Sequence, residues 1–364
     1  MSIETKHGLI FDISENIILK NLLGMAGTRI SFRNPGVCGL YCFEDDSGLY
    51  DGTGMTCDGA EITPSGFIFR WHSECFSLES EFSYDFDSKV WSRCDSVTNI
   101  TDKVQTIYSC LSRFVLESAA VEVYTQSSVW NHENQGVWAP LVTSVTAENH
   151  GLRTTEGSTP IAAVRQKGQN GGVVFHLFPM GKWKINVSKR IGTSGSMHTV
   201  IDMGLSDEKL KLKVAPGEKL QLPEIVFFRF NDEALDAHKL HRYLIKNKLS
   251  TNIPPVIYNS WFLDFDVLDF EYFRAQVDVA SKLGIEVFTV DAGWFGDGVH
   301  WTRSVGDWEE NQVGAFGGRM RELAEYVRSK GIKFGLWMEP ERATPHSKLY
   351  NKNPDLFFLS DSGD

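Results

Sequence analysis

The segment GIEVFTVDAGW, residues 284–294, decides the fold that we predict for this chain. Its apolar side chains run almost without a break over residues 285–290. That continuity is typical of a parallel β-strand buried on both faces, because a strand with one face in water alternates apolar and polar residues. Asp291 follows at the carboxyl end of this strand, and Trp294 comes shortly after it. Because α/β proteins bind ligands at the carboxyl ends of parallel strands, both side chains are candidate substrate contacts.

Further strands and helices alternate on both sides of this segment. We expect a strand over residues 256–261, a helix over 269–283 that Gly284 ends, and a buried strand over 332–338. Strands that alternate with helices predict a parallel sheet with right-handed crossovers. The long loop over residues 295–317 favours a (β/α)8 barrel over a doubly wound sheet. A complete barrel takes about 250 residues, so residues 254–364 are expected to hold only about three of its eight units.

The preceding part of the chain, residues 1–231, is predicted to be an antiparallel β-sandwich domain. Short apolar or alternating runs recur between turn signals at residues 67–71, 121–124, 173–178, 183–187 and 225–230. The clearest hairpin is LKLKVAPGEKLQL, residues 210–222, in which leucines alternate with lysines on both sides of a Pro-Gly turn.

A linking helix is predicted between the two parts, in residues 232–253. Asp232 is its expected N-cap, and its apolar side ends near residue 247. His238 and His241 lie on this helix, but a zinc site needs at least three protein ligands and no third accompanies them. We therefore expect a packing or surface role for the two histidines, and no metal.

Composition narrows the class of protein. The length of 364 residues exceeds the roughly 250–300 at which single cores stop growing, which predicts two domains. The net charge of −11 argues against nucleic acid or an anionic membrane as a partner. The first residues carry acids where a secretion signal needs an apolar run, and no stretch approaches the roughly 18 apolar residues of a membrane span. Six cysteines, at positions 38, 42, 57, 75, 94 and 110, lack paired spacing, so we predict a cytoplasmic protein with reduced thiols.

Three successive strands end in residues suited to a sugar. The first strand ends in Trp261, Asp291 and Trp294 follow the second, and the third ends near Trp337, with Glu339 and Glu341 just beyond it. Carboxylates accept hydrogen bonds from hydroxyl groups, and indole rings stack on the apolar faces of sugars. A single strand-end Asp is often only the N-cap of the next helix, but three such strand ends together predict a site for a neutral polyhydroxylated ligand. No G-x-G-x-x-G motif follows any strand, and no cofactor is expected.

These motifs resemble those of a known family. NSWF at 259–262, VDAGWFG at 290–296, GDW at 306–308 and GIKFGLWMEPE at 331–341 resemble the family 36 glycoside hydrolases, chiefly α-galactosidases. The resemblance implies retaining hydrolysis of terminal α-galactosides of oligosaccharides, without a cofactor. It also implies homo-oligomers that assemble through the β-sandwich domain. By position, Trp261 and Trp337 are expected to wall the galactose site, and Asp291 to hold sugar hydroxyls. Trp294 and Asp307 are assigned a loop-ordering role as readily as a ligand contact.

The catalytic acids of the family have no counterpart here. Retaining enzymes use two acids about 5 Å apart, and the family's nucleophile lies in a K-x-D-x-N motif that is absent after residue 341. We therefore assign no catalytic residue, expect the pair to lie C-terminal to this chain, and expect the chain alone to be inactive. A non-catalytic carbohydrate-binding fragment is the alternative from another class.

One position departs from the family pattern. The second Asp of the family's D-D-G-W motif is Ala292 in this chain. A hydrogen bond to a charged acceptor contributes about 1.5–3 kcal/mol, so we predict a shifted or relaxed sugar preference. An α-N-acetylgalactosaminidase or a transglycosidase therefore stays open within the enzyme class.

Overall fold

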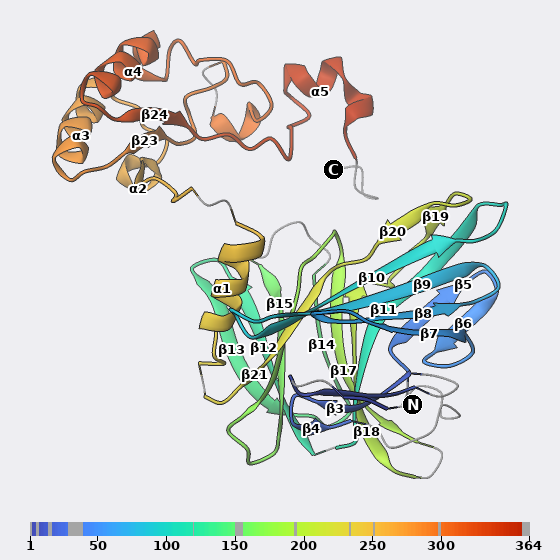
Figure 1. The fold of residues 1–364 in the computed structure, drawn as a ribbon. Coiled ribbons are helices and arrows are strands. Elements are labelled where there is room, and N and C mark those ends of the chain that lie inside the picture. Colours follow the sequence, from blue (N-terminus) through green and yellow to red (C-terminus); the bar gives the residue numbers. More distant parts are fainter. Residues whose placement is uncertain are drawn as a thin grey trace. The chain divides into compact units, whose positions relative to one another are not determined.

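The computed structural model divides the chain into two compact units, Met1–Leu249 and Ser250–Asp364. It describes residues 2–4, 7–13, 17–27, 39–118, 120–149, 156–192, 195–232, 234–249, 252–297 and 300–358. Cys38 and the last six residues, 359–364, lie outside the described part. Figure 1 shows strands throughout the first unit and mixed helices and strands in the second. The predicted boundaries at residues 231 and 253 stay a prediction.

The first unit is built from antiparallel sheets, as predicted. In the described residues, a ten-stranded sheet has the order β13-β12-β15-β16-β21-β10-β9-β8-β7, with β20 also paired to β10. A seven-stranded sheet has the order β14-β17-β18-β11-β5-β6, with β19 also paired to β11, and a small sheet has the order β1-β2-β3-β4.

The bounds of the strands in the large sheet are β7 Thr56–Ile62, β8 Gly66–His72, β9 Phe76–Asp85, β10 Val90–Asn99, β12 Val121–Val129, β13 His132–Pro140, β15 Gly157–Gln166, β16 Gly172–Leu177, β20 Lys219–Gln221 and β21 Ile225–Phe230. Those of the second sheet are β5 Tyr41–Asp45, β6 Gly48–Asp51, β11 Gln105–Leu116, β14 Ser144–Asn149, β17 Trp183–Ile191, β18 Met197–Leu205 and β19 Leu212–Val214. The small sheet contains β1 Ser2–Glu4, β2 Leu9–Ile13, β3 Ile17–Leu22 and β4 Met25–Ala26.

One aromatic-rich core holds these sheets together. Phe114 on β11 packs against Phe227 on β21 with ring centroids 5.1 Å apart, which joins the two large sheets. Trp91 and Phe82, each 1% exposed, lie in the same core. Alternating burial along β9 puts every second side chain into this layer, as a sheet with one solvated face requires. The strand predictions at residues 67–71, 121–124, 173–178, 183–187 and 225–230 are confirmed.

The hairpin predicted over residues 210–222 is wrong in its pairing. The chain does turn at Pro216–Gly217, where the backbone N–H of Glu218 donates to the carbonyl of Ala215 at 3.0 Å. However, β19 pairs with β11 of one large sheet, whereas β20 pairs with β10 of the other. Each short strand thus satisfies its backbone groups on a longer neighbour, and the turn carries the chain from one sheet to the other.

The linking helix begins later than predicted. Helix α1 covers His238–Asn247, and its N-cap is Ala237 rather than Asp232. Leu235 and Asp236 have φ values of 56° and 49°, which no α-helix contains. Leu235 is 6% exposed and packs with Leu240 on the outer face of the large sheet, so its burial fixes a turn where the sequence pattern predicted helix.

The second unit is a parallel three-stranded sheet with helices, as predicted for the start of a barrel. Its order is β22-β23-β24, with β22 Ile257–Asn259, β23 Val287–Val290 and β24 Lys333–Leu336. The helices are α2 Trp261–Asp264, α3 Phe270–Lys282, α4 Met320–Ser329 and α5 Lys348–Lys352, with short 3₁₀ turns at Trp301–Arg303, Phe316–Gly318 and Pro354–Leu356. Asp269 caps α3 by accepting from the N–H of Tyr272 at 2.8 Å, and Gly284 follows the helix with φ of 78°.

Strand β23 is fully buried on only one face, contrary to the prediction. Phe288 is 0% exposed, stacks on Tyr258 at 4.8 Å, and contacts Phe273 of α3. On the opposite face Val287 and Thr289 are only half-buried, and the neighbouring Ile257 is 56% exposed. Only the face that carries Phe288 is fully buried, because α3 and α4 supply the apolar cluster that covers it.

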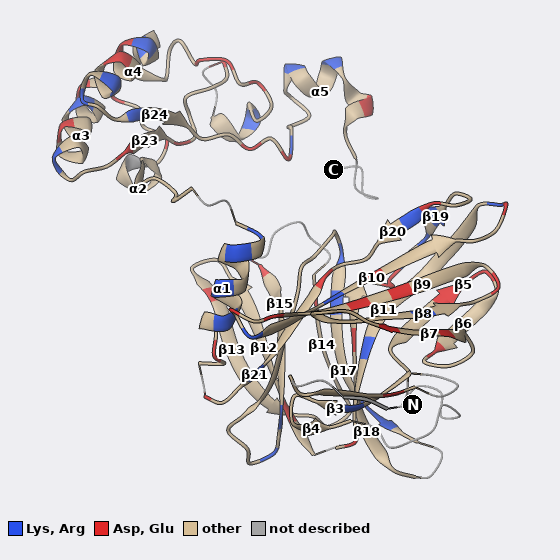
Figure 2. Ribbon diagram, viewed as in Figure 1, with Lys and Arg blue, Asp and Glu red and all other residues tan. Residues whose placement is uncertain are grey.

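Charged residues of both signs are spread over the two units, and Figure 2 shows them together on α3 and α4. No helix in the described residues is both long and apolar enough to cross a membrane.

Candidate functional site

The three parallel strands bring the predicted site residues to one edge of the sheet. Asn259, Thr289 and Gly335 are register partners, so the carboxyl ends of β22, β23 and β24 lie at the same level. Trp261 begins α2 just beyond β22, Asp291 follows β23 directly, and Trp337 follows β24 directly. The edge therefore carries one carboxylate and two indole rings that come from segments far apart in the sequence.

The Asp291 carboxylate is held in place by its neighbours. Asp291 is 8% exposed, and its Oδ2 accepts a hydrogen bond of 2.6 Å from the side-chain amide of Asn259. Its Oδ1 accepts from the backbone N–H of Ala292 at 2.7 Å, and its own N–H donates to the hydroxyl of Ser260 at 3.0 Å. A carboxylate oxygen has two lone pairs, so each keeps one acceptor position after these bonds.

Asn259 connects the carboxylate to the first indole. Besides donating to Asp291, its Oδ1 accepts from the backbone N–H of Trp261 at 2.8 Å. One amide side chain thus fixes both the acid and the start of α2. The sequence reading did not assign Asn259 a role, although an amide as the last residue of a strand, two positions before a Trp, was a readable signal.

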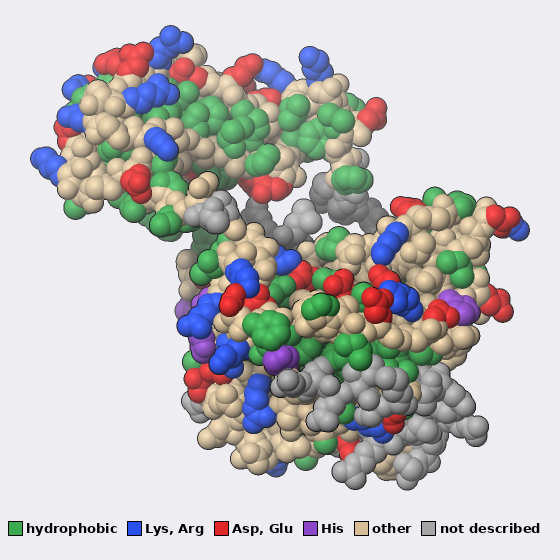
Figure 3. All heavy atoms as spheres, in the orientation of Figure 1, with side chains coloured by type: hydrophobic (Ala, Val, Ile, Leu, Met, Phe, Trp, Pro, Cys, Tyr) green, Lys and Arg blue, Asp and Glu red, His purple; other side chains and the backbone are tan. Residues whose placement is uncertain are grey.

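Trp301 joins the two predicted indoles into one aromatic wall. Its ring is 5.7 Å from that of Trp261 and 5.8 Å from that of Trp337, with interplanar angles of 88° and 84°. All three side chains are half-buried, so part of each ring stays open. The sequence reading missed Trp301 because it lies in the long loop after β23, where spacing gives no register. Figure 3 shows hydrophobic side chains gathered on the face of the second unit between α4 and α5.

Trp294 lies beneath this wall rather than in it. Its side chain is 4% exposed, and its indole N–H donates to the backbone carbonyl of Trp337 at 2.8 Å. It also stacks on Trp308 with centroids 6.2 Å apart. With its donor used and its ring covered, Trp294 supports the segment that carries Trp337. Of the two roles that the sequence left open, this geometry fits loop ordering.

Asp307 also orders a loop. Its two carboxylate oxygens accept from the backbone N–H groups of Lys348 and Leu349 at 3.0 and 3.2 Å, in the first turn of α5. Such a carboxylate satisfies N–H groups that the helix itself leaves unpaired.

The acids after β24 differ from each other in their surroundings. Glu339 is 6% exposed and forms a two-pronged ion pair with Arg342, at 2.7 and 3.0 Å. Glu341 is exposed. Near the wall, Asp266 and His300 approach each other to 3.6 Å. In the described residues, no group of three or more His, Cys, Asp or Glu side chains is arranged to hold a metal ion.

Ala292 is buried among apolar side chains. It is 1% exposed and belongs to the cluster that contains Trp294 and Phe295. Its methyl group therefore packs into the core of this unit.

These features define the fold class of the chain, which is an antiparallel β-sandwich followed by the first parallel βα units of a (β/α)8 barrel. Residues 223–363 match the family model described as Melibiase. Alpha-galactosidase Mel36A of Lactobacillus acidophilus is 34% identical over 187 residues, which are 50% of this chain and 25% of that protein. Alpha-galactosidase AgaA of Geobacillus stearothermophilus is 29% identical over 235 residues, which are 62% of this chain and 32% of that protein. The chain is a homologue of the family 36 α-galactosidases, and the alignments span only 25% and 32% of these two relatives' lengths.

Solved structures share the fold along the whole chain. The α-galactosidase from Lactobacillus brevis superimposes with a TM-score of 0.83 at 17% identity, covering 100% of this chain and 58% of that one. A variant of AgaA from Geobacillus stearothermophilus, solved in complex with stachyose, gives a TM-score of 0.79 at 18% identity, covering 99% of this chain and 59% of that one.

Proposed function

We propose that this chain carries the sugar-recognition edge of an α-galactosidase-type glycoside hydrolase that acts on terminal α-galactosides of oligosaccharides. The observation that carries the proposal is the Asp291 carboxylate, fixed by Asn259 beside indole rings from three different segments. Its homologues are α-galactosidases, and variants of AgaA were solved with stachyose and raffinose.

The chemistry of the edge suits a galactosyl unit. A fixed carboxylate with one free acceptor position on each oxygen can take two neighbouring hydroxyl groups, and each such bond contributes about 1.5–3 kcal/mol. The open parts of the Trp261, Trp301 and Trp337 rings offer apolar surface to the C–H face of the sugar. The carboxylate sets the orientation of the ring, while the indoles supply contact area.

Hydrolysis itself is assigned to residues outside this chain. A retaining mechanism needs a nucleophilic carboxylate and a proton donor about 5 Å apart, and the family's K-x-D-x-N motif does not occur after residue 341. We therefore propose that the chain binds a terminal α-galactoside without cleaving it. The whole enzyme would cleave the glycosidic bond with an acid pair C-terminal to residue 364.

A direct experiment measures binding and turnover together. The purified chain is titrated with raffinose in a calorimeter and incubated with an aryl α-galactoside. Binding without release of the aryl group supports the proposal. Release by the chain alone, abolished in Asp291→Ala, contradicts the placement of the acid pair. Absence of binding contradicts the recognition edge.

A non-catalytic carbohydrate-binding protein is the second candidate, favoured by the same missing motif. The length of the natural polypeptide separates the two. A strand with K-x-D-x-N further along supports the enzyme, and a natural end at residue 364 supports the binding protein.

We also propose that the sugar preference is shifted or relaxed compared with the family. This part rests on Ala292, which the resemblance of the sequence matches to the second family carboxylate and whose methyl group is buried. We expect the absence of this carboxylate to lower the preference for an α-galactoside over an α-glucoside or an α-N-acetylgalactosaminide by roughly tenfold to hundredfold, the effect of one lost hydrogen bond to a charged acceptor. A strong α-galactoside preference that Ala292→Asp leaves unchanged contradicts this part.

A further inference from the structure

A second candidate site lies on the first unit, in a cavity of about 240 Å³. Its walls come from five separate segments of the chain, which together contribute His7, Gly8, Leu23, Tyr84, Lys89, Trp91, Arg229 and Lys239. Figure 3 shows Lys and Arg side chains beside hydrophobic ones on the part of this unit that carries α1. Neither the sugar-recognition edge nor its chemistry involves any of these residues.

Three cationic side chains face this cavity. Arg229 donates its Nη1 to the carbonyl of Leu23 at 2.9 Å and its Nε to the side chain of Asn231 at 3.2 Å. These bonds leave three of its five guanidinium hydrogens without an acceptor in the described residues. The Lys89 ammonium has no hydrogen-bond or ion-pair partner in that part of the chain. Lys239 is partly neutralised, because Asp236 lies 2.8 Å from its Nζ.

The position of Arg229 is built into the backbone. Gly24 has φ of 95°, and a Cβ atom there would lie 2.1 Å from Nη1 of Arg229. The guanidinium therefore contacts the backbone at Gly24 and is hydrogen-bonded to the Leu23 carbonyl, which restricts the conformations of the Arg229 side chain. A cation fixed in this way loses little conformational entropy when it binds an anion.

Aromatic rings form the other wall. His7 stacks on Tyr84 with centroids 4.1 Å apart and an interplanar angle of 9°. Trp91 lies 5.1 Å from Tyr84 and donates its indole N–H to the His7 carbonyl at 3.3 Å. This contact ties the N-terminal segment to β10. The cavity thus joins a flat apolar surface to fixed positive charge in a chain whose net charge is −11.

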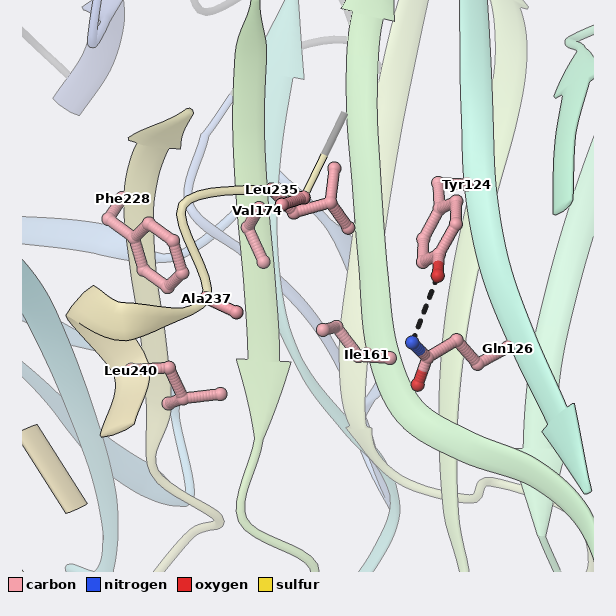
Figure 4. A pocket seen from close by; sticks show the side chains of 9 residues that line it. Tyr124, Gln126, Ile161, Val174, Phe228, Leu235, Ala237 and Leu240 are labelled. Carbon is pink, nitrogen blue, oxygen red and sulfur yellow. Dashed lines mark hydrogen bonds between the residues drawn. The ribbon is translucent and has the colours of Figure 1, made fainter. Parts of the chain in front are cut away.

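Another cavity of this unit, among the described residues, has a different lining. It measures about 160 Å³ and lies between α1, with the residues just before it, and the outer face of the large sheet. Figure 4 shows Leu235, Ala237 and Leu240 facing Val174, Phe228 and Ile161, with only the hydrogen-bonded Tyr124 and Gln126 as polar side chains. It contains no charged group, so it serves as an internal comparison.

We propose that the cavity at Lys89 and Arg229 binds an anionic monosaccharide, with the sugar's phosphate or carboxylate on these two cations and its ring against Tyr84 and His7. The volume is below the roughly 300–1,000 Å³ of sites for drug-sized ligands, which favours one ring over a nucleotide or an oligosaccharide. Unused donors on Arg229, Lys89 and Lys239 suit a ring that carries hydroxyl groups. Arg and Lys together are the side chains that bind phosphate and carboxylate oxygens.

Calorimetric titration of the 364-residue chain tests this inference. The probes are a hexose 6-phosphate, a hexuronate, the neutral hexose and inorganic phosphate. We expect saturable binding of at least one anionic sugar, at least tenfold tighter than that of the neutral hexose or of phosphate alone, and weakening as salt is raised. The two anionic probes distinguish a phosphate from a carboxylate ligand.

Two variants link the binding to the cavity. Lys89→Asn removes one charge with a residue that tolerates the left-handed backbone at this position, where φ is 59°. Arg229→Gln removes the second charge and keeps a donor for the Leu23 carbonyl. Each is expected to weaken binding about tenfold or more, as loss of a hydrogen bond to a charged group does. The control Lys211→Ala removes the same charge from a residue that does not line the cavity, and should leave the affinity unchanged.

The inference is overturned if no anionic sugar binds, if the neutral hexose or inorganic phosphate binds as tightly, or if both cavity variants bind like the control. Raffinose binding at the recognition edge is a separate readout, so failure of one site leaves the test of the other intact.

Discussion

The substitution Asn259→Asp tests the recognition edge with a change of a single atom type. It keeps the oxygen that accepts from the N–H of Trp261 at 2.8 Å, but replaces the amide nitrogen that donates to Asp291 at 2.6 Å. Two carboxylates at that separation cannot both be ionised, so one takes up a proton or the two side chains move apart. Two ionised side chains would repel each other and move Asp291 from its fixed position, whereas a proton shared between them spreads one negative charge over both residues and lowers the charge that Asp291 presents to a sugar.

The expected magnitude follows from that one bond. A hydrogen bond to a charged group is worth about 1.5–3 kcal/mol, which corresponds to roughly a tenfold to hundredfold loss of affinity. Raffinose affinity is measured by calorimetry for the chain, for Asn259→Asp and for Asn134→Asp, a control that introduces the same charge at an exposed position of β13 in the first unit. Circular dichroism verifies that each variant is folded. A folded Asn259→Asp variant with unchanged affinity would refute the role of the carboxylate.

Three other predictions concern the wall and the fold. Trp301→Ala should weaken raffinose binding by about 0.5–1.5 kcal/mol or more, since it removes the ring that joins Trp261 to Trp337; calorimetry of this variant against Trp130→Ala, an exposed Trp of the first unit, checks it. Arg113→Met should lower the free energy of unfolding in urea by about 3–5 kcal/mol. Arg113 is 0% exposed, and its replacement leaves the buried Asp202 without the partner that lies 2.7 Å away. A double variant that removes the charges of both Arg113 and Asp202 should recover part of the loss. Burial lowers the pKa of His176 to about 4. As pH falls from 6.5 to 4, His176 therefore binds a proton in the unfolded chain but stays neutral in the folded chain. Stability should drop by up to about 3 kcal/mol over that window, and urea unfolding of His176→Phe at pH 7 and pH 4.5 should show a smaller drop than the unmodified chain.

The second unit was predictable because its signals are local. The apolar stripe of the helix predicted over residues 269–283 and its stop signal Gly284 act within a few turns of chain, and both are confirmed in α3. The buried run in β23 predicted the strand and its parallel partners. Burial on both faces was wrong, because the sequence of one strand does not say which layers cover it.

The errors in the first unit arise from contacts between distant segments. The pattern over residues 210–222 indicates two strands and a turn, but their partners β11 and β10 lie far away in the sequence. Similarly, the start of α1 is displaced because Leu235 is buried against the sheet in a left-handed conformation. Amphipathic spacing alone cannot report either effect.

The candidate site was found in part for the same reasons. Strand ends pointed to Trp261, Asp291 and Trp337, which do share one edge. Asn259 and Trp301 were missed because their roles depend on contacts with residues 32 and 36–40 positions away, and the buried, hydrogen-bonded state of Trp294 depends on the Trp337 carbonyl 43 positions away.

The most direct test of the account is the affinity of the purified chain for raffinose before and after Asp291→Ala. The account predicts saturable binding that falls at least tenfold in the variant while the far-ultraviolet circular dichroism spectrum stays the same. Equal affinity of the two proteins would contradict the claim that this carboxylate recognises the terminal sugar.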